Sequence, residues 1–195
     1  TYDKIEVIIV DDGSTDETAA VCDELARAHS NVKVIHKLHE GRAGLAREFG
    51  RRAARGEYLQ YLDSDDLLMP TKFSEMVAAL EEHPDCDIAY CYTRRYRIGT
   101  VPEDDAVEWT GKTFDSMFPT FLAKRFWCTS TPIYRRSLCD KTGPWTDLPQ
   151  WEDIEYDVRL ATFQPRLYHH KNFLTDMRCL PNSLSDVRIL DDKFL

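Results

Sequence analysis

The sequence lacks three features that would each point to a common class of protein. None of its six cysteines forms a Cys-x-x-Cys pair, so the usual spacing of a structural zinc site is absent. No apolar run is long enough to cross a bilayer as a helix. Positive charge is in deficit, because 25 Lys and Arg face 34 Asp and Glu. The resulting formal net charge of −9 disfavours nucleic acid as a partner.

The rest of the composition is that of a globular protein. The 195 residues, 43% of them hydrophobic, suffice for one sizeable core, so we expect a single domain over residues 1–195. Cysteines such as Cys22 and Cys91 lie among apolar residues and are interpreted as buried thiols of a reducing compartment. The composition therefore predicts a cytoplasmic location.

Strand and helix patterns alternate in the first half. The β-branched run Ile5–Val10 predicts a strand buried on both faces, and Ser14 with Glu17 predicts a capping box for the next helix. Further strands are expected at 32–36, 57–62, 87–92 and 128–135, and helices around 45–53, 73–80, 113–124 and 152–163. This order predicts an α/β fold with a mixed, mostly parallel central sheet flanked by helices. Ligands of such sheets bind beyond the carboxyl ends of the strands.

The most informative stretch is Leu-Gln-Tyr-Leu-Asp-Ser-Asp-Asp-Leu-Leu-Met at residues 59–69. It places Asp63, Asp65 and Asp66 at the end of a predicted strand. Like charges this close repel when buried, and a divalent cation such as Mn²⁺ or Mg²⁺ would relieve that repulsion. The alternative is an Asp-rich turn that starts the next helix, since Asp and Ser favour turns and N-caps. This stretch alone leaves both interpretations open.

Three acidic motifs follow one another along the chain. They are Asp11-Asp12-Gly13, Asp63-Ser64-Asp65 and Trp151-Glu152-Asp153. Two further landmarks, Gly41-Arg42-Ala43 and Ala54-Arg55-Gly56, lie between the first motif and the second. In this order they resemble the family 2 glycosyltransferases, which have the GT-A fold. The resemblance implies a Rossmann-like nucleotide-diphospho-sugar transferase fold, with a nucleotide-binding half at 1–92 and an acceptor-binding half at 93–195.

The resemblance also implies an activity. It is the transfer of a sugar from a nucleotide-sugar, with a UDP-sugar as the favoured donor, to a hydroxyl of a saccharide or a lipid-linked acceptor. The transfer would proceed by a single displacement with inversion and would use Mn or Mg. Peripheral association with the inner face of the membrane stays open for a lipid-linked acceptor.

The same resemblance assigns roles on the donor side. Asp65 would ligate the metal, and Asp63 would bond the ribose or reach the metal through water. Asp12 would contact the nucleotide base, whereas Asp11 suits either that contact or a turn. Arg42 would contact a phosphate or the base of the nucleotide. Alternatively, its charge faces solvent and contacts no ligand. We expect Asp66 to brace the turn.

On the acceptor side, Asp153 resembles the catalytic base that takes the proton of the attacking hydroxyl. Acidic residues also stabilise helix N-termini without any catalytic role, and the motif alone does not separate the two. Glu152 would orient the acceptor or brace Asp153, and Trp151 with Trp145 would offer a stacking face for a sugar ring or belong to the core.

Arg178 and Ser183 resemble a C-terminal family segment that closes over the diphosphate. The sequence also departs from the family pattern. The family opens with a strand and turn about thirty residues before its Asp-Asp-Gly motif, so we expect this sequence to lack that first strand. Glu48 stands where the family's Ala-Arg-Asn motif has asparagine, which adds a charge near the expected nucleotide side and leaves the donor open.

Three rival interpretations were weighed. A nucleotidyltransferase on a related fold would carry a glycine-rich basic phosphate loop, which is not seen here. A phosphoacceptor receiver domain would share the acidic end of the first strand but would leave Asp65 and the Glu152-Asp153 pair unexplained. An inactive glycosyltransferase-like binding domain would be expected to lose carboxylates that are all present here.

Overall fold

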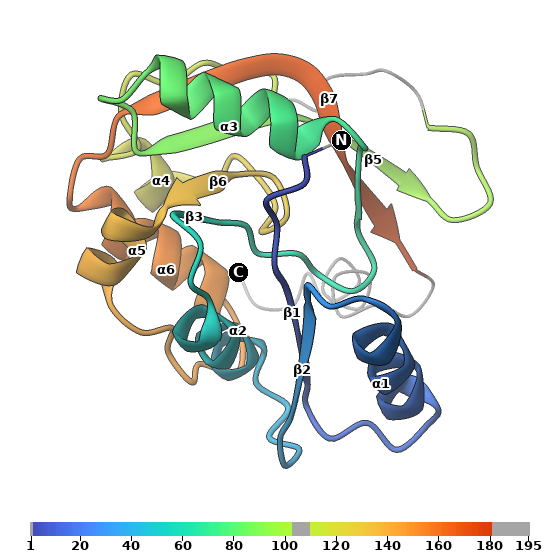
Figure 1. The fold of residues 1–195 in the computed structure, drawn as a ribbon. Helices are drawn as coiled ribbons and strands as arrows, with labels where there is room; N and C mark the ends of the chain where they lie inside the picture. The colour runs from blue at the N-terminus through green and yellow to red at the C-terminus, as the bar shows by residue number, and fades with distance from the viewer. Residues whose placement is uncertain (1, 103–109, 181–195) are drawn as a thin grey trace.

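The computed structural model describes residues 2–102 and 110–180. Two strands, β1 (Val7–Asp11) and β2 (Val32–His36), form a parallel pair. The helix α1 (Thr18–Ala28) packs against β2, and α2 (Ala43–Ala53) packs against β1 (Figure 1). None of the described helices is long and apolar enough to cross a membrane.

The remaining strands form a five-stranded sheet in the order β3-β6-β5-β7-β4. Their bounds are Tyr58–Leu59 for β3, Leu67–Leu68 for β4, Ile88–Arg97 for β5, Ile133–Arg135 for β6 and Leu167–Cys179 for β7. The β5–β7 pair is parallel, whereas β3–β6, β5–β6 and β4–β7 are antiparallel. The predicted mixed α/β fold is confirmed, but antiparallel pairs outnumber parallel ones among the described strands, because β6 and β4 run against their neighbours.

Four more helices complete the described chain. They are α3 (Lys72–Glu82), α4 (Thr120–Ala123), α5 (Arg136–Thr142) and α6 (Glu152–Ala161). Figure 1 shows α3 on one side of the five-stranded sheet and α4, α5 and α6 on the other.

The core is divided by β5. Ile88 and Tyr90 pack into an aromatic cluster with side chains of α4 and α6, while Ala89 and Cys91 pack against α3. Successive side chains of a strand point to opposite faces, so a strand covered on both sides is apolar at every position. Residues 88–91 are accordingly fully buried.

Several local predictions need correction. The strand at 32–36 is confirmed, but the expected strand at 128–135 is reduced to β6, and the expected helix at 113–124 to α4. The capping box is wrong, because the Ser14 N–H donates to Asp11 Oδ1 at 3.0 Å and α1 begins only at Thr18. No pattern had predicted β7, whose residues 169–172 are polar.

A buried lysine fixes the sheet beneath the acidic turn. The Nζ of Lys72 donates to the Ser130 carbonyl at 2.6 Å, to the Thr131 carbonyl at 2.9 Å and to Thr175 Oγ1 at 2.6 Å. These bonds satisfy a side chain that is fully buried, and burial lowers its pKa. They tie α3 to β7 and to the segment before β6, which supports the acidic turn at 63–66.

Candidate active site

The acidic turn presents two of its three carboxylates outward. The Asp63 N–H donates to Ser130 Oγ at 3.1 Å, and the Asp66 N–H donates back to the Asp63 carbonyl at 3.1 Å. Asp63 and Asp65 are partly exposed, whereas Asp66 is buried. The turn therefore offers the side chains of Asp63 and Asp65 to a ligand and keeps that of Asp66 for its own support.

Asp66 connects the turn to β7. Its Oδ1 accepts the Arg178 backbone N–H at 3.2 Å, and burial raises the pKa of its carboxyl to about 6 against the opposing hydrogen bond from Ser130. The Arg178 side chain also reaches the turn, where its Nε donates to the Asp65 carbonyl. These contacts fit the bracing role expected for Asp66. Ser183 lies outside the described residues.

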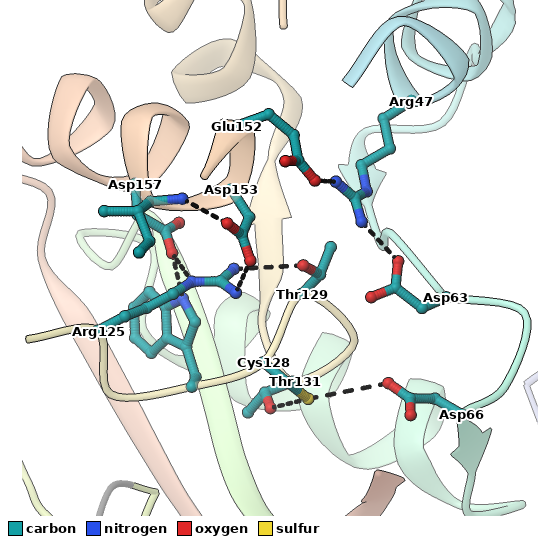
Figure 2. A network of polar contacts seen from close by, with 12 residues as sticks. Arg47, Asp63, Asp66, Arg125, Cys128, Thr129, Thr131, Glu152, Asp153 and Asp157 are labelled. Carbon is teal, nitrogen blue, oxygen red and sulfur yellow. Dashed lines mark hydrogen bonds and ion pairs between the residues drawn. The ribbon is translucent and has the colours of Figure 1, made fainter. Parts of the chain in front are cut away.

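Arg47 joins the acidic turn to the start of α6. Its Nη2 lies 2.7 Å from Asp63 Oδ1, and its Nη1 lies 2.8 Å from Glu152 Oε1 (Figure 2). Its guanidinium also lies over the Trp145 ring, 5.0 Å from the centroid. The sequence had marked Arg47 only as part of a family landmark. The structure makes it the cation between two predicted site residues.

A second arginine holds Asp153. The Nη1 of Arg125 lies 2.6 Å from Asp153 Oδ2, and its Nε lies 2.6 Å from Asp157 Oδ2 (Figure 2). The indole N–H of Trp127 donates to the same Asp157 oxygen at 3.1 Å. No sequence motif had pointed to Arg125 or Asp157. One signal was available, since Asp157 follows Asp153 by four residues and so shares its helix face.

The N-terminus of α6 has an unusual entry. Trp151 precedes the helix with φ 63° and ψ 18°, the left-handed region that bulky residues rarely adopt. Its ring is exposed, whereas Trp145 is buried and stacked on Tyr156 with ring centroids 4.0 Å apart. Only Trp151 of the two predicted stacking residues is therefore available at the surface, and Trp145 belongs to the core.

Asp11 and Asp12, at the end of β1, have partners other than the two arginines. Asp11 is buried, its Oδ1 accepts the Ser14 N–H at 3.0 Å, and its Oδ2 lies 2.9 Å from His36 Nδ1. These hydrogen bonds, from Ser14 first and His36 second, lower the pKa of Asp11 to about 2. Asp11 therefore occupies the turn position that the sequence had left as one of two alternatives.

Asp12 holds the loop between β2 and α2. Its carboxylate pairs with the Lys37 ammonium and accepts the Glu40 N–H at 3.1 Å and the Gly41 N–H at 2.8 Å. Arg42, the next residue, is the N-cap of α2. A helix rises about 1.5 Å per residue, so Arg42 and Arg47 lie roughly 7–8 Å apart along the axis. The helix α2 thus leads from the Asp12 loop to the carboxylates in Figure 2.

The extra charge of Glu48 does not face a ligand site. Its carboxylate accepts from Arg51 Nε at 2.8 Å, from Arg52 Nε at 2.7 Å and from the Trp145 N–H at 3.2 Å. The Glu48 side chain is buried among these three partners. The expectation that Glu48 adds a charge on the nucleotide side is therefore wrong, because two arginines neutralise it.

The pair formed by His36 and Asp11 predicts a pH dependence of stability. Hydrogen bonds to Asp11 and Asp23 raise the pKa of His36 in the folded protein. Protonated His36 therefore stabilises the fold fully at pH values below the ordinary histidine pKa of about 6.5. This contribution is lost as the pH rises through the raised value, whereas Asp11 stays ionised down to about pH 2. We expect His36→Gln to lower Tm more at pH 5.5 than at pH 8.5. Thermal melts at both pH values test this.

The exposed His29 provides the control, because its ring has no carboxylate partner in the part of the chain that the structure describes. His29→Gln should change Tm equally at both pH values. An equal loss for His36→Gln would contradict a charged His36.

The acidic turn suits a hard cation whose remaining ligands are phosphate oxygens and water. The described residues contain no group of three acidic, histidine or cysteine side chains that could hold a metal alone. The Asp65 carboxylate makes no hydrogen bond or ion pair with any described residue, and Asp63 shares its charge with Arg47. Mg²⁺ and Mn²⁺ sites often use one or two carboxylates, with phosphate oxygens and water as the other ligands. The donor set therefore fits such an ion in the presence of a phosphate ligand.

Comparison with known proteins agrees with the fold. Residues 1–143 match the family described as Glycosyl transferase family 2, so the chain belongs to this family. It is 37% identical over 117 residues to a putative glycosyltransferase, EpsH, of Bacillus subtilis, which covers 60% of this chain and 30% of EpsH.

Two solved structures show the GT-A fold. TarS 1–349 of S. aureus in complex with UDP-GlcNAc has a TM-score of 0.75 at 21% identity, covering 91% of this chain and 50% of that one. The mannosyltransferase PcManGT of Pyrobaculum calidifontis, in complex with GDP-Man and Mn²⁺, has a TM-score of 0.65 at 17% identity, covering 90% and 47%. The chain thus spans at most about half the length of these relatives.

Proposed function

We propose that this chain carries the active site of a metal-dependent glycosyltransferase. It would move a sugar from a nucleotide-sugar to a hydroxyl of a saccharide or a lipid-linked acceptor. One observation carries the proposal: the Asp65 carboxylate, which has no partner among the described residues, and the Asp153 carboxylate at the start of α6 belong to one connected site, joined through Asp63, Arg47 and Glu152. A donor phosphate site and an acceptor base are the two parts that glycosyl transfer requires.

The donor side would use residues at the ends of β1 and β3. Asp12 orders the 37–41 loop and Arg42 is the N-cap of α2, so both would contact the nucleotide. Asp63 would bond its ribose. The complexes of TarS with UDP-GlcNAc and of PcManGT with GDP-Man support a nucleotide-sugar, and we favour a UDP-sugar. Asp65, assisted by Asp63, would hold Mn²⁺ or Mg²⁺. When bound, that ion would neutralise the charge of the leaving nucleoside diphosphate.

The acceptor side would use the start of α6. Asp153 would remove the proton of the attacking hydroxyl, and the N-terminus of the helix stabilises its charge, since Asp153 Oδ1 accepts the Ile154 N–H at 2.8 Å. Glu152 is held by Arg47, which leaves it to orient the acceptor rather than attack the donor. Among the described residues Asp153 has no second unpaired carboxylate beside it, which supports a single inverting displacement.

Trp151 suits the sugar ring of the acceptor. Its left-handed backbone costs of order 1–3 kcal/mol, and such strain is most often kept at functional sites. The residue is 63% exposed beside Glu152 and Asp153. An exposed indole next to the proposed base provides the apolar face on which a pyranose packs.

A cytoplasmic location remains part of the proposal. All six cysteines are free and buried, as expected for a reducing compartment. Peripheral contact with the inner face of the membrane would suit a lipid-linked acceptor.

Substitution of Asp65 tests the donor site. At about a hundredfold excess over its Kd, a ligand stabilises the folded state by about 2.7 kcal/mol. For a chain of this size we therefore expect UDP with Mn²⁺ to raise Tm by about 5–10 °C. Asp65→Ala should remove most of that shift, because it removes the free carboxylate. A thermal-shift series with UDP, UDP-GlcNAc and GDP-Man, with Mn²⁺ or with EDTA, measures it.

The exposed neighbour Ser64 supplies the matched control, and Ser64→Ala should keep the full shift. A shift of equal size in EDTA would refute the metal assignment. The absence of a shift with every nucleotide would refute the donor site as a whole.

A further inference from the structure

The proposed base is part of a largely buried triad of charges, Asp153, Arg125 and Asp157, of which Asp153 is the most exposed member. Arg125 lies between the two carboxylates, 2.6 Å from an oxygen of each. The side chain of Asp153 is 26% exposed, whereas those of Arg125 and Asp157 are 13% and 2% exposed. Only Asp153 can meet a substrate, so the other two members act through it.

We propose that Arg125 and Asp157 are positioning residues that fix the orientation of the Asp153 carboxylate and keep it basic. This inference rests on the proposed function, in which Asp153 accepts the proton of the acceptor hydroxyl. Arg125 alone would orient Asp153 but would also weaken it as a base, because an adjacent cation favours the ionised carboxylate. Asp157 removes that penalty by sharing the arginine charge.

The charge balance of the triad supports this role. Two carboxylates and one guanidinium carry a net charge of −1 before proton transfer. When Asp153 takes the proton of the acceptor hydroxyl, the hydroxyl oxygen uses the freed electron pair to bond the anomeric carbon. The bond from that carbon to the donor phosphate breaks, its electron pair leaves with the nucleoside diphosphate, and the triad becomes neutral. Asp157 and Arg125 then remain as a closed ion pair, so no uncompensated charge stays buried in the product state.

The wider surroundings contribute little free charge. Glu152 is paired with Arg47 on the side of α2, and burial raises the pKa of the Tyr134 phenol and of the Cys128 thiol, the latter to about 12, so both stay neutral. Burial opposes the charge of Asp157, and Arg125 counteracts that effect. Among the described residues, Arg125 is the ion-pair partner of Asp153 and Asp157 is the carboxylate that interacts with it.

Asp157→Asn changes the charge and spares the geometry. Both bonds to Asp157, from Arg125 Nε and Trp127 Nε1, end on the same oxygen, which the amide oxygen of asparagine replaces. The variant leaves the arginine charge to Asp153 alone. We expect the acid limb of the kcat profile to move down by about one pH unit. The plateau should fall about threefold with the donor KM unchanged.

Arg125→Lys gives a second, independent measurement. A single ammonium keeps the charge but lacks the planar fork that sets Nη1 against Asp153 and Nε against Asp157, so the orientation of Asp153 is loosened. We expect kcat to fall tenfold to a hundredfold with the donor KM unchanged. Glu155→Gln, which breaks the pair with Arg159 on the same helix, is the control and should leave the profile unchanged.

The probe reaction is the release of UDP from UDP-GlcNAc with Mn²⁺ and water as acceptor, followed from pH 4 to 9. UDP-glucose, UDP-galactose and GDP-mannose serve in turn if UDP-GlcNAc is not cleaved. An inactive wild type, or an active Asp153→Asn, defeats the proposed function itself.

The triad inference is tested separately from it. With active wild type and inactive Asp153→Asn, an Asp157→Asn profile that superimposes on wild type or moves upward overturns the inference. Should Asp157→Asn fail to fold in a thermal melt, Arg125→Lys decides, and a wild-type kcat in that variant overturns the inference as well.

Discussion

Asp153→Asn is expected to lower kcat for sugar transfer by about a thousandfold, in the middle of the range for a general base. That loss corresponds to about 4 kcal/mol of transition-state stabilisation. The amide keeps the shape and accepts the bond from Arg125, but it cannot take a proton. The fold should persist, because Arg125 still pairs with buried Asp157. Donor binding should be unchanged, since we assign Asp153 to the acceptor side.

Two measurements separate these effects. Product formation gives kcat, and titration of UDP with Mn²⁺ gives the Kd of the nucleotide. Asp147→Asn is the control, because this exposed carboxylate lies in the same loop before α6. A variant that loses nucleotide binding together with activity would show that Asp153 belongs to the donor site, and full activity would remove it from the mechanism.

Gly44→Ala is expected to destabilise the fold and loosen the site at the same time. A Cβ at this position of α2 would lie 2.2 Å from the backbone carbonyl oxygen of Thr146 and 3.3 Å from the Glu152 side chain. A backbone oxygen cannot turn away, so α2 must move from the segment that leads to α6. Overpacking of this kind costs about 1–3 kcal/mol, or roughly 2–12 °C in Tm for a chain of this size. The movement also pulls Arg47 away from Glu152, so kcat should fall with stability.

Gly50→Ala on the same helix is the matched control. Its Cβ would meet only Val10 Cγ2 at 3.6 Å, an ordinary contact. Alanine in a helix interior is favoured over glycine by up to about 1 kcal/mol, so this variant should be neutral or slightly more stable. Thermal and urea melts of both variants measure the difference. Equal stability of the two would contradict the close approach of α2 to the Thr146 segment.

Much of the fold was predictable because local patterns agreed with it. The strand at 32–36 and the helices that became α2, α3 and α6 follow from hydrophobic spacing, glycine and proline. The long strand β7 was not predictable in the same way. It pairs in parallel with β5 across about eighty residues of sequence, and its polar segment 169–172 hides the strand pattern.

The properties of the site likewise divide into those that the sequence predicted and those that only the structure revealed. From the sequence by itself we predict that Asp12, Asp63, Asp65, Glu152 and Asp153 belong to the site, because they stand in motifs whose order resembles family 2. The sequence could not show which of them carry a free charge.

That was decided by the tertiary structure, through arginines far away in the sequence. Arg47 meets Glu152 across 105 residues, and Arg125 meets Asp153 across 28. Among the described residues, the fold gives the Asp65 carboxylate no partner, holds Asp63 and Glu152 on one guanidinium and shares another between Asp153 and Asp157. The physical reason is burial, since a buried carboxylate requires a partner and only the packing of α2, α6 and the loop before β6 supplies one.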